Sequence, residues 1–530
     1  MAISTVSPPF EGTMELTIKN PRTGELLYTL PEAAEAAIGQ AFTKARAAAR
    51  SIASLSVPQR LEECRKLKRY ISLHKEDIVQ RIVDETGKPR TEAILTEIYP
   101  ALDLIHHYEK TAPKVLRDEK HPTPLVLMGK TSKVYYEPMG TVLIISPWNY
   151  PFNLSFTPII TALIAGNAVV FKPSEHTPLK GLLEDIFEKS GFLKDVVQVV
   201  YGGKEVGSRC IDQQPDKIFF TGSEAAGKAI MAHAANYLIP VELELGGKDP
   251  MVVFDDVNIN RCVNGAVWGG MTNAGQTCTS VERILVQQSI YPKFIEELKR
   301  EIAELTTPAN CGSFDDKNID IGCMTAEFQI RKVEAQIQDA IEKGATVHCG
   351  GQREPGSHVF PPTLITGIDP SMKIYADETF GPVVTVMPFK DEAEAVRLAN
   401  DSPYGLSASV WSGDLVRADR VARAIVTGNV SINNVLATQG NSSLPFGGVK
   451  QSGMGRYKGA HGLYSFSNIK SILVDRNSGR YEPIWYPYTK EKYGLISRLV
   501  DASFLGGLAG LIQVALVGLK LERLEKKRHL

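Results

Sequence analysis

The segment NAGQTCTS, residues 273–280, surrounds Cys278 with polar side chains. A cysteine that only fills space in a core normally has aliphatic neighbours, so this setting is unusual. Two roles remain open: a structural thiol, which is the commoner role of a single cysteine, and a nucleophile. A nucleophilic cysteine needs a route to the thiolate, a donor that stabilises the oxyanion, and a base for the second half of the reaction.

Two further residues have the right types for the donor and the base. Asn149 follows the apolar run TVLII in SPWNYPF (146–152), and an asparagine amide can donate to an oxyanion without carrying a charge. Glu244 lies between Leu243 and Leu245, where desolvation would raise its pKa, as a general base working near neutral pH requires. Each also has an ordinary interpretation, Asn149 as a turn residue and Glu244 on the solvent face of its strand.

Two segments carry groups that suit a nucleotide. In GNAVVFKPSE (166–175), Lys172 and Glu175 follow a strand-like run, where they could bind ribose hydroxyls or simply be solvated. In ETFGPV, Glu378 and Phe380 could lie against ribose and nicotinamide or form an ordinary turn before a strand.

A third segment, FTGSEAAGKA (220–229), predicts a strand, a Gly-Ser turn and a helix that opens with Glu224. The N–H groups at the start of such a helix could hold a phosphate. The spacing from Gly222 to Gly227 does not match G-x-G-x-x-G, and Ala229 stands where a P-loop needs Ser or Thr. By motif alone, this segment is weak evidence for dinucleotide binding.

Short β-rich apolar runs alternate with helical segments along much of the chain. This alternation predicts an α/β fold in which helices cover parallel sheets, in two tandem units with a ligand cleft between them. The predicted strands are 141–146, 167–172, 196–202, 217–222, 240–247, 250–255, 283–288, 383–389 and 429–434. The predicted helices lie within 31–119 and at 155–166, 223–238, 291–304, 324–343 and 392–400.

The whole chain narrows the class of protein. It has 530 residues, with 59 Lys and Arg against 60 Asp and Glu, so no basic excess exists to bind nucleic acid. Its seven cysteines include no C-x-x-C pair, so we expect no metal site, and their odd number fits a reducing compartment. The N-terminal MAISTVSPPFEGTMEL has no basic segment followed by an apolar run, so we expect no secretory signal and a cytoplasmic catalytic part.

Seven segments, in this order, resemble the aldehyde dehydrogenase superfamily over roughly residues 15–475. They are SPWNYPF, GNAVVFKPSE, FTGSEAAGK, LELGGKDP, GQTC, ETFGPV and PFGGVKQSGMGR (445–456). The resemblance implies NAD(P)-dependent oxidation of an aldehyde to a carboxylic acid. It implies that Cys278 attacks the carbonyl carbon, Asn149 and the Cys278 N–H hold the oxyanion, and Glu244 activates the water that hydrolyses the thioester.

The resemblance also implies a site for NAD, with NADP as the alternative cofactor. Lys172 and Glu175 would bind the adenosine ribose, Gly222 and Ser223 would lie by the pyrophosphate, and Glu378 would bind the nicotinamide ribose. The implied set is Ile145, Ser146, Pro147, Trp148, Lys172, Ser174, Glu175, Gly222, Ser223, Gly227, Gly246, Glu378 and Phe380. Glu175 favours NAD because its charge would repel a 2′-phosphate.

The implied fold has three parts. We expect a Rossmann-like NAD(P)-binding domain (1–120 and 142–246), an α/β catalytic domain (247–456), and a small β bridging element (121–141 and 457–480) that joins subunits into a homodimer or homotetramer. Strand-like segments at 131–140 and 464–475 fall in the bridging element. Two other functions remain as alternatives: a catalytically silent, membrane-tethered scaffold, against which the intact site residues argue, and a dehydrogenase that passes the thioester to coenzyme A, against which Glu244 argues.

The tail, residues 481–530, departs from the family pattern. Residues 502–519 form a run of 18 without charge, which as one helix would be roughly 27 Å long, just short of the ~30 Å hydrocarbon core. Basic residues follow it, and an aromatic cluster precedes it, as in interfacial anchors. We therefore expect a membrane anchor and a lipophilic aldehyde as substrate. Packing of this helix on protein is the alternative, favoured by Gln513 and by the small residues around Gly506 and Gly510.

Overall fold

The structure is a computed structural model that describes residues 15–124, 127, 129–308, 318–476 and 481–528. The chain forms two compact units. The first comprises Met1–Leu116 and Glu137–Asn468, and the second comprises Arg117–Tyr136 and Ile469–Leu530.

A six-stranded sheet in the first unit carries the loops that follow its strands to the site. Its order is β17-β9-β8-β5-β6-β7, and all strands are parallel except β17. Every residue of β5, β6 and β8 is buried, as expected for a parallel sheet covered on both faces. The strands are β5 (Thr141–Ile145), β6 (Ala168–Lys172), β7 (Val197–Val199), β8 (Lys217–Thr221), β9 (Val241–Glu244) and β17 (Gly453–Met454).

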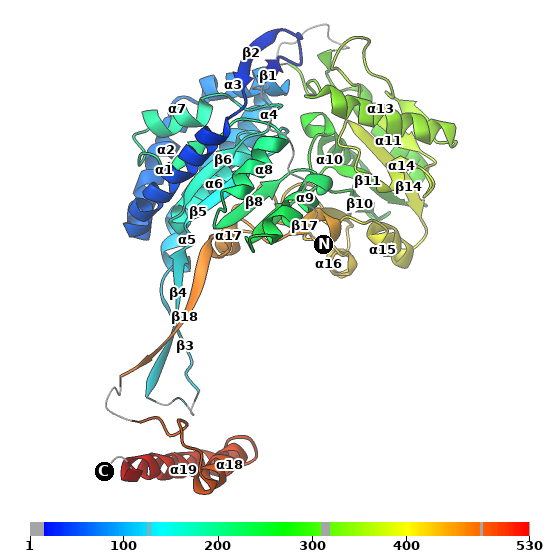
Figure 1. Ribbon diagram of the computed structural model, residues 1–530. Helices are drawn as coiled ribbons and strands as arrows, with labels where there is room; N and C mark the ends of the chain where they lie inside the picture. The colour runs from blue at the N-terminus through cyan, green and yellow to red at the C-terminus, as the bar shows by residue number, and fades with distance from the viewer. Residues whose placement is uncertain (1–14, 125–126, 128, 309–317, 477–480, 529–530) are drawn as a thin grey trace, which may run out of the picture. The chain divides into compact units, whose positions relative to one another are not determined.

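Helices cover both faces of this sheet. On one face, α1 (Glu35–Ser54) and α8 (Lys204–Asp212) contact each other and the strands, and α9 (Glu224–Ala235) continues that layer (Figure 1). On the other face, α6 (Asn153–Ala165) packs on β5 and β6. The helices behind or beside α6 are α2 (Val57–Leu73), α3 (Lys75–Thr86), α4 (Arg90–Ala93), the π-helical turn η1 (Ile94–Ile98), α5 (Tyr99–Val115) and α7 (Leu182–Lys189).

A seven-stranded sheet forms the other half of the first unit. Its order is β12-β13-β14-β11-β10-β15-β16, and only the edge strand β12 is antiparallel. Its strands are β10 (Asp249–Val253), β11 (Val281–Gln287), β12 (Thr346–Cys349), β13 (Thr363–Thr366), β14 (Val383–Phe389), β15 (Ser407–Trp411) and β16 (Asn429–Ile432). The accompanying helices are α10 (Ile259–Met271), α11 (Tyr291–Ala303), α13 (Glu327–Glu342), α14 (Lys373–Ala376), α15 (Glu392–Asn400) and α16 (Leu415–Ala424). The short turns η3 (Thr272–Gly275) and η4 (Lys450–Ser452) complete it. Helix α17 (Gly459–Ser465) packs on α5 and α6 instead.

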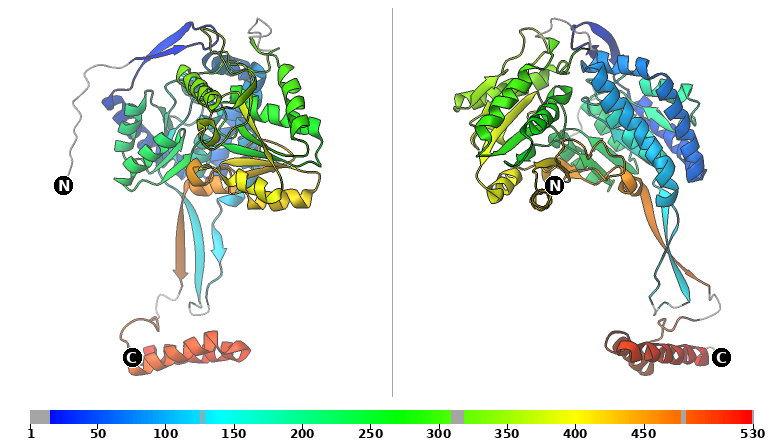
Figure 2. Two further views of the ribbon diagram at one scale, coloured as in Figure 1. Left: turned by 90° about the vertical axis from the view of Figure 1, so that its right-hand side faces the viewer. Right: turned by 180° about the vertical axis from the view of Figure 1, so that it is seen from behind.

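The observed elements confirm the predicted α/β fold with parallel sheets. Each predicted strand and helix of the two α/β regions has an observed counterpart, with ends shifted by up to a few residues. The rear view in Figure 2 shows the blue helices, which include α1 to α5, gathered in the first unit. The sequence did not predict the antiparallel pair β1 (Glu15–Lys19) and β2 (Leu26–Pro31) that precedes these helices.

The second unit contains a small antiparallel sheet and a pair of helices. The sheet order is β18-β4-β3, with β3 at Glu119–His121, β4 at Lys130–Pro138 and β18 at Ser467–Asp475. The strands β4 and β18 match the two strand-like segments predicted at 131–140 and 464–475.

The prediction of one apolar helix over residues 502–519 is wrong. Helix α18 (Lys490–Phe504) ends within this run. After a break, helix α19 (Gly507–Arg528) begins at Gly507, whose φ is 53°. A left-handed residue does not continue a right-handed helix, and the break divides the apolar run between two helices. Within the described residues, no helix is long and apolar enough to cross a membrane, which removes the support for the predicted anchor.

The two tail helices instead pack on each other (Figure 1). A β-carbon on Gly510 would collide with the backbone of Ala502, so the small residues near Gly506 and Gly510 serve contact between α18 and α19. Lys492 and Glu525 form an ion pair between the helices that is almost fully buried. Phe504, Leu505 and Leu508 remain more than four-fifths exposed, each at 82% or above.

Candidate active site

A cavity of about 570 Å³ lies where loops leave the carboxyl ends of β5, β6, β8 and β9. Ligands bind at this edge of open α/β sheets. All but one of the residues predicted for the site line the cavity. They are Ile145, Ser146, Pro147, Trp148, Asn149, Lys172, Ser174, Glu175, Gly222, Ser223, Glu244, Gly246, Cys278, Glu378 and Phe380.

Cys278 lies in the tight loop between η3 and β11. The turn η3, which leads into this loop, passes through left-handed residues at Asn273 and Ala274, with φ values of 56° and 52°, and at Gly275. A β-carbon on Gly275 would collide with the carbonyl of Gly381, so this position needs glycine. The loop leaves Cys278 partly exposed to the cavity, whereas the thiols of Cys64, Cys210, Cys262 and Cys323 are buried.

Asn149 is held beside this loop by hydrogen bonds between loops that belong to the two different sheets. Its Nδ2 donates to the carbonyl of Gln276 at 2.9 Å, and its own carbonyl accepts from Asn273 Nδ2 at 3.0 Å. The Tyr150 hydroxyl and Thr277 Oγ1 are 2.6 Å apart, which ties the neighbouring residues together as well. Asn149 therefore reaches the cavity from a loop that is joined directly to the loop of Cys278.

Glu244 ends strand β9, and its carboxylate is buried with 4% exposure. Neither carboxylate oxygen has a hydrogen-bond partner among the described residues. Burial, together with the nearby charge of Glu242, raises the pKa of Glu244 well above its usual value. This is the shift predicted from the flanking leucines, and it gives Glu244 the affinity for protons that a general base needs.

The electrostatics around Cys278 keep its sulfur protonated. Burial raises the pKa of the Cys278 thiol, and the carboxylates of Asp249, Glu378 and Glu244 raise it further by disfavouring a second negative charge. A thiolate in this site therefore needs a compensating change, such as transfer of the proton as the carbonyl carbon is attacked.

A loop across the cavity presents Glu378 and Phe380. Glu378 accepts a hydrogen bond from the Gly247 N–H at 3.0 Å, and burial raises its pKa to about 7. Behind this loop, Glu282 accepts from the N–H groups of Thr379 and Phe380 at 2.8 and 2.9 Å. Glu282 is paired with Lys248 at 2.6 Å, and both side chains are buried.

The groups predicted for the adenosine end also lie together. Lys172 Nζ is 3.3 Å from Glu175 Oε2 at the end of β6. Burial by itself would raise the pKa of Glu175, but the ammonium of Lys172 and other contacts bring it below its usual value. Ser223 caps α9 by accepting from the Ala226 N–H at 3.3 Å, as the predicted helix start requires.

Gly227 is the predicted cofactor residue that does not line the cavity. It lies inside α9, and a β-carbon there would approach Leu245 Cδ2 to 2.7 Å. Its small size lets the helix pack closely on Leu245, which follows β9, and its predicted contact with the cofactor stays a prediction.

The structure adds residues that the sequence did not indicate. His176, Lys332 and Phe328 line the cavity, and Phe328 packs edge-on against Trp148 with ring centroids 5.9 Å apart. Lys458 is buried, and its Nζ bonds the carbonyl of Gln439, whose side chain accepts from Thr279 next to Cys278. Burial lowers the pKa of Lys458 to about 8, although the negative charges of the site oppose the shift.

Comparison with known proteins identifies the family. The model of the Aldehyde dehydrogenase family matches residues 10–472. The chain belongs to the aldehyde dehydrogenase family. It is 42% identical over 496 residues to a 4,4'-diapolycopene aldehyde oxidase from a Methylomonas species, covering 93% of this chain and 92% of that protein.

Solved aldehyde dehydrogenases have the same fold. An aldehyde dehydrogenase from Mycobacterium tuberculosis, in complex with NAD+, superposes with a TM-score of 0.82 at 32% identity over 88% of this chain and 95% of the other. An NADP-dependent enzyme from E. coli gives a TM-score of 0.83 at 32% identity over 87% of this chain and 95% of the other. The protein is thus an NAD(P)-dependent enzyme that oxidises aldehydes, and neither alternative function is favoured.

The cavity of this aldehyde dehydrogenase fits NAD(P). Lys172 and Glu175 offer a cation and a carboxylate to ribose hydroxyls, and the N-terminus of α9 offers N–H groups to a pyrophosphate. At Gly246 the backbone passes so close to the Glu378 carboxylate that a β-carbon would come within 2.6 Å of Oε2. The missing side chain leaves that carboxylate at the cavity surface.

We expect the reactivity of Cys278 in the free aldehyde dehydrogenase to rise steeply with pH. Because its pKa is raised and only the thiolate reacts, iodoacetamide should alkylate it slowly at pH 7 and about tenfold faster per pH unit up to pH 9. Mass spectrometry of the peptide that contains Cys278 measures the rate, with the partly exposed Cys349 as an internal reference. A plateau below pH 8 at Cys278 alone would mean that the free enzyme already holds a thiolate.

Proposed function

We propose that Cys278, Asn149 and Glu244 oxidise an aldehyde to a carboxylic acid through a thioester on Cys278. The supporting observation is that these three side chains line the same cavity as Lys172, Glu175 and the other groups that fit NAD(P). Cys278 and Asn149 lie on loops of different sheets, so only the folded chain brings them to one cavity.

In the proposed reaction, the Cys278 sulfur passes its proton to water and bonds to the aldehyde carbon. The carbonyl oxygen gains negative charge, which the Asn149 amide and the Cys278 N–H stabilise by hydrogen bonding. When bound, NAD(P) supplies the electrophilic nicotinamide carbon that accepts a hydride, so that a thioester remains on Cys278. Glu244 then takes a proton from water, whose oxygen bonds to the acyl carbon, and the carbon–sulfur bond breaks.

The role of Glu244 predicts a single-turnover phenotype for Glu244→Gln. The amide keeps the shape of the side chain but accepts no proton, so hydrolysis should slow by about 100-fold or more. Mixing this variant with NAD and aldehyde should give a burst of about one equivalent of reduced cofactor, followed by slow turnover, with the acyl group on Cys278 detected by mass spectrometry.

The contrast is Cys278→Ala, which should give neither the burst nor turnover. A Glu244→Gln enzyme with unchanged steady-state rate would assign the base to another residue. Full oxidation by Cys278→Ala would remove the covalent mechanism.

We further propose a long, apolar aldehyde as the substrate and NAD as the cofactor. The support for the substrate is the relative that is 42% identical over nearly the whole chain, whose name gives a diapolycopene aldehyde. The support for NAD is Glu175, whose lowered pKa keeps a negative charge where NADP would carry its 2′-phosphate.

This proposal predicts a dependence of activity on chain length. Each methylene that becomes buried adds ~0.8 kcal/mol of binding, so burial of only two of the nine extra methylenes of dodecanal should raise kcat/KM above that for propanal by about tenfold or more. Reduction of NAD followed by absorbance measures both, with a short charged aldehyde as the control and coenzyme A added in parallel. Equal kcat/KM across the series would contradict the apolar substrate, and stimulation by coenzyme A would favour acyl transfer.

We also propose that the chain forms a homo-oligomer through β18. This strand lies at one edge of the sheet of the second unit, and an edge strand presents backbone groups that can pair with another chain. Sedimentation equilibrium at micromolar concentration should give a multiple of the chain mass, and a single-chain mass would reject the proposal.

A further inference from the structure

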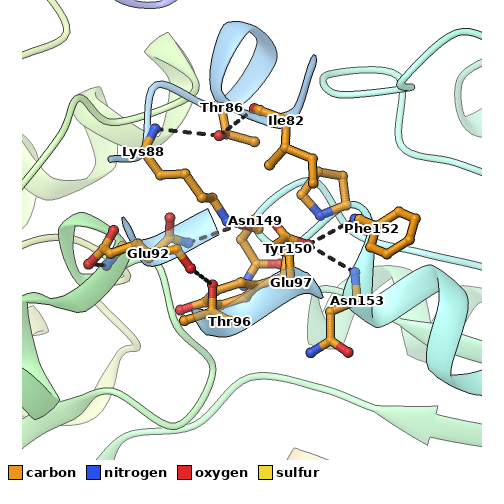
Figure 3. A network of polar contacts seen from close by, with 12 residues as sticks. Ile82, Thr86, Lys88, Glu92, Thr96, Glu97, Asn149, Tyr150, Phe152 and Asn153 are labelled. Atoms are coloured by element: carbon orange, nitrogen blue, oxygen red, sulfur yellow. Dashed lines mark hydrogen bonds and ion pairs between the residues drawn. The ribbon is translucent and has the colours of Figure 1, made fainter. Parts of the chain in front are cut away.

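An ion pair that solvent does not reach lies behind the Asn149 loop. Lys88 lies in the connection between α3 and α4, and Glu97 lies in the π-helical turn η1. Lys88 Nζ is 2.6 Å from Glu97 Oε1, and the two side chains are 1% and 0% exposed. Figure 3 shows that both charged groups point at the segment from Asn149 to Asn153.

Each member of the pair binds the backbone of this segment. Lys88 Nζ donates to the carbonyl oxygen of Asn149 at 2.9 Å and lies 4.2 Å from the ring centroid of Tyr150. Glu97 Oε2 accepts from the N–H groups of Phe152 and Asn153, both at 2.9 Å, where α6 begins (Figure 3). The cation thus holds the first residue of the segment and the carboxylate holds its end.

The backbone of Asn149 determines where its amide points. One N–H of that amide donates to the Gln276 carbonyl, and the Asn149 carbonyl is shared by Lys88 and Asn273. An asparagine amide has two N–H groups, and no described residue bonds the second one. Asn149 and Cys278 line the same cavity, so contacts that fix the backbone and the amide of Asn149 also fix this donor at the wall of that cavity.

A buried ion pair contributes little to the free energy of unfolding. The cost of removing two charges from water offsets most of their attraction, and apolar side chains of similar volume often serve the fold as well. What apolar side chains cannot do is bind a carbonyl and two N–H groups in fixed directions. The chemistry of this pair therefore suits orientation of the segment more than cohesion of the core.

We propose that Lys88 and Glu97 are positioning residues that act through Asn149, holding its amide where the oxyanion forms. The inference rests on the proposed role of Asn149 as oxyanion donor. A displacement of about 1 Å in such a donor costs about 100-fold in rate, so the effect falls on kcat for acyl formation and not on cofactor binding.

The test combines Lys88→Met/Glu97→Gln with Asn149→Ala. The double substitution removes both charges together, so no unpaired charge is buried, and the amide oxygen that replaces the Glu97 carboxylate can still accept from a backbone N–H. Stopped-flow formation of reduced cofactor measures the acyl-forming step in four proteins: the wild type, the double variant, Asn149→Ala, and the triple variant. We expect the double variant to slow this step by about 100-fold, and to have little effect in a protein that already lacks the Asn149 amide.

Two further measurements exclude a general loss of structure. Alkylation of Cys278 by iodoacetamide forms no oxyanion, so its rate should be unchanged in the double variant, as should the Kd for NAD. The matched control is Lys492→Met/Glu525→Gln, which removes a pair of similar burial from the second unit and should leave the acyl-forming rate within about twofold of wild type.

The outcomes separate the two proposals. If Asn149→Ala does not slow the acyl-forming step, the proposed oxyanion role of Asn149 fails. If Asn149→Ala slows it but the double variant does not, or slows it by the same factor with and without Asn149, then Lys88 and Glu97 do not act through Asn149 and the inference is overturned.

Discussion

The hydrogen bonds between the Asn149 loop and the Cys278 loop are the constraint on which the active site depends. Asn149 follows a strand of the six-stranded sheet, and Cys278 precedes a strand of the seven-stranded sheet, so no single element fixes their separation. The bond from Asn149 Nδ2 to the Gln276 carbonyl and the contact between Tyr150 and Thr277 fix it instead. A hydrogen-bond donor in an active site must lie within a fraction of an ångström of its working position. These bonds supply that precision, which core packing alone does not.

The same site gathers several carboxyl groups in a place with little solvent. Burial raises the pKa values of Glu244, Asp249 and Glu378, and burial together with these three carboxyl groups raises that of Cys278. Desolvated carboxylates destabilise the folded state. The free energy of unfolding is therefore smaller than it would be with apolar residues at these positions. The raised pKa of Glu244 suits its proposed role as a base near neutral pH, and the raised pKa of Cys278 keeps the thiol protonated.

The sequence predicted those parts of the fold and site whose signal is local. Strands buried on both faces, such as β5 and β8, are short apolar runs, and Asn149, Glu244 and Cys278 stand out against their neighbours. Lys88 and Glu97 could not be found in this way, because a lysine and a glutamate nine residues apart near helices look like solvated surface residues until tertiary structure buries them. The uncharged run 502–519 misled for the opposite reason: its small residues serve contact between α18 and α19, and a left-handed glycine divides it.

One device recurs behind the cavity. Glu97, paired with Lys88, accepts the N–H groups of Phe152 and Asn153, and Glu282, paired with Lys248, accepts those of Thr379 and Phe380. Loops that leave a parallel sheet have backbone N–H groups without partners in the ladder, and these must be satisfied when buried. A carboxylate can accept two successive N–H groups. The buried lysine beside it balances the negative charge that the carboxylate brings into the interior. The Asn149 loop and the Glu378 loop are thus held by the same kind of contact on two sides of one cavity.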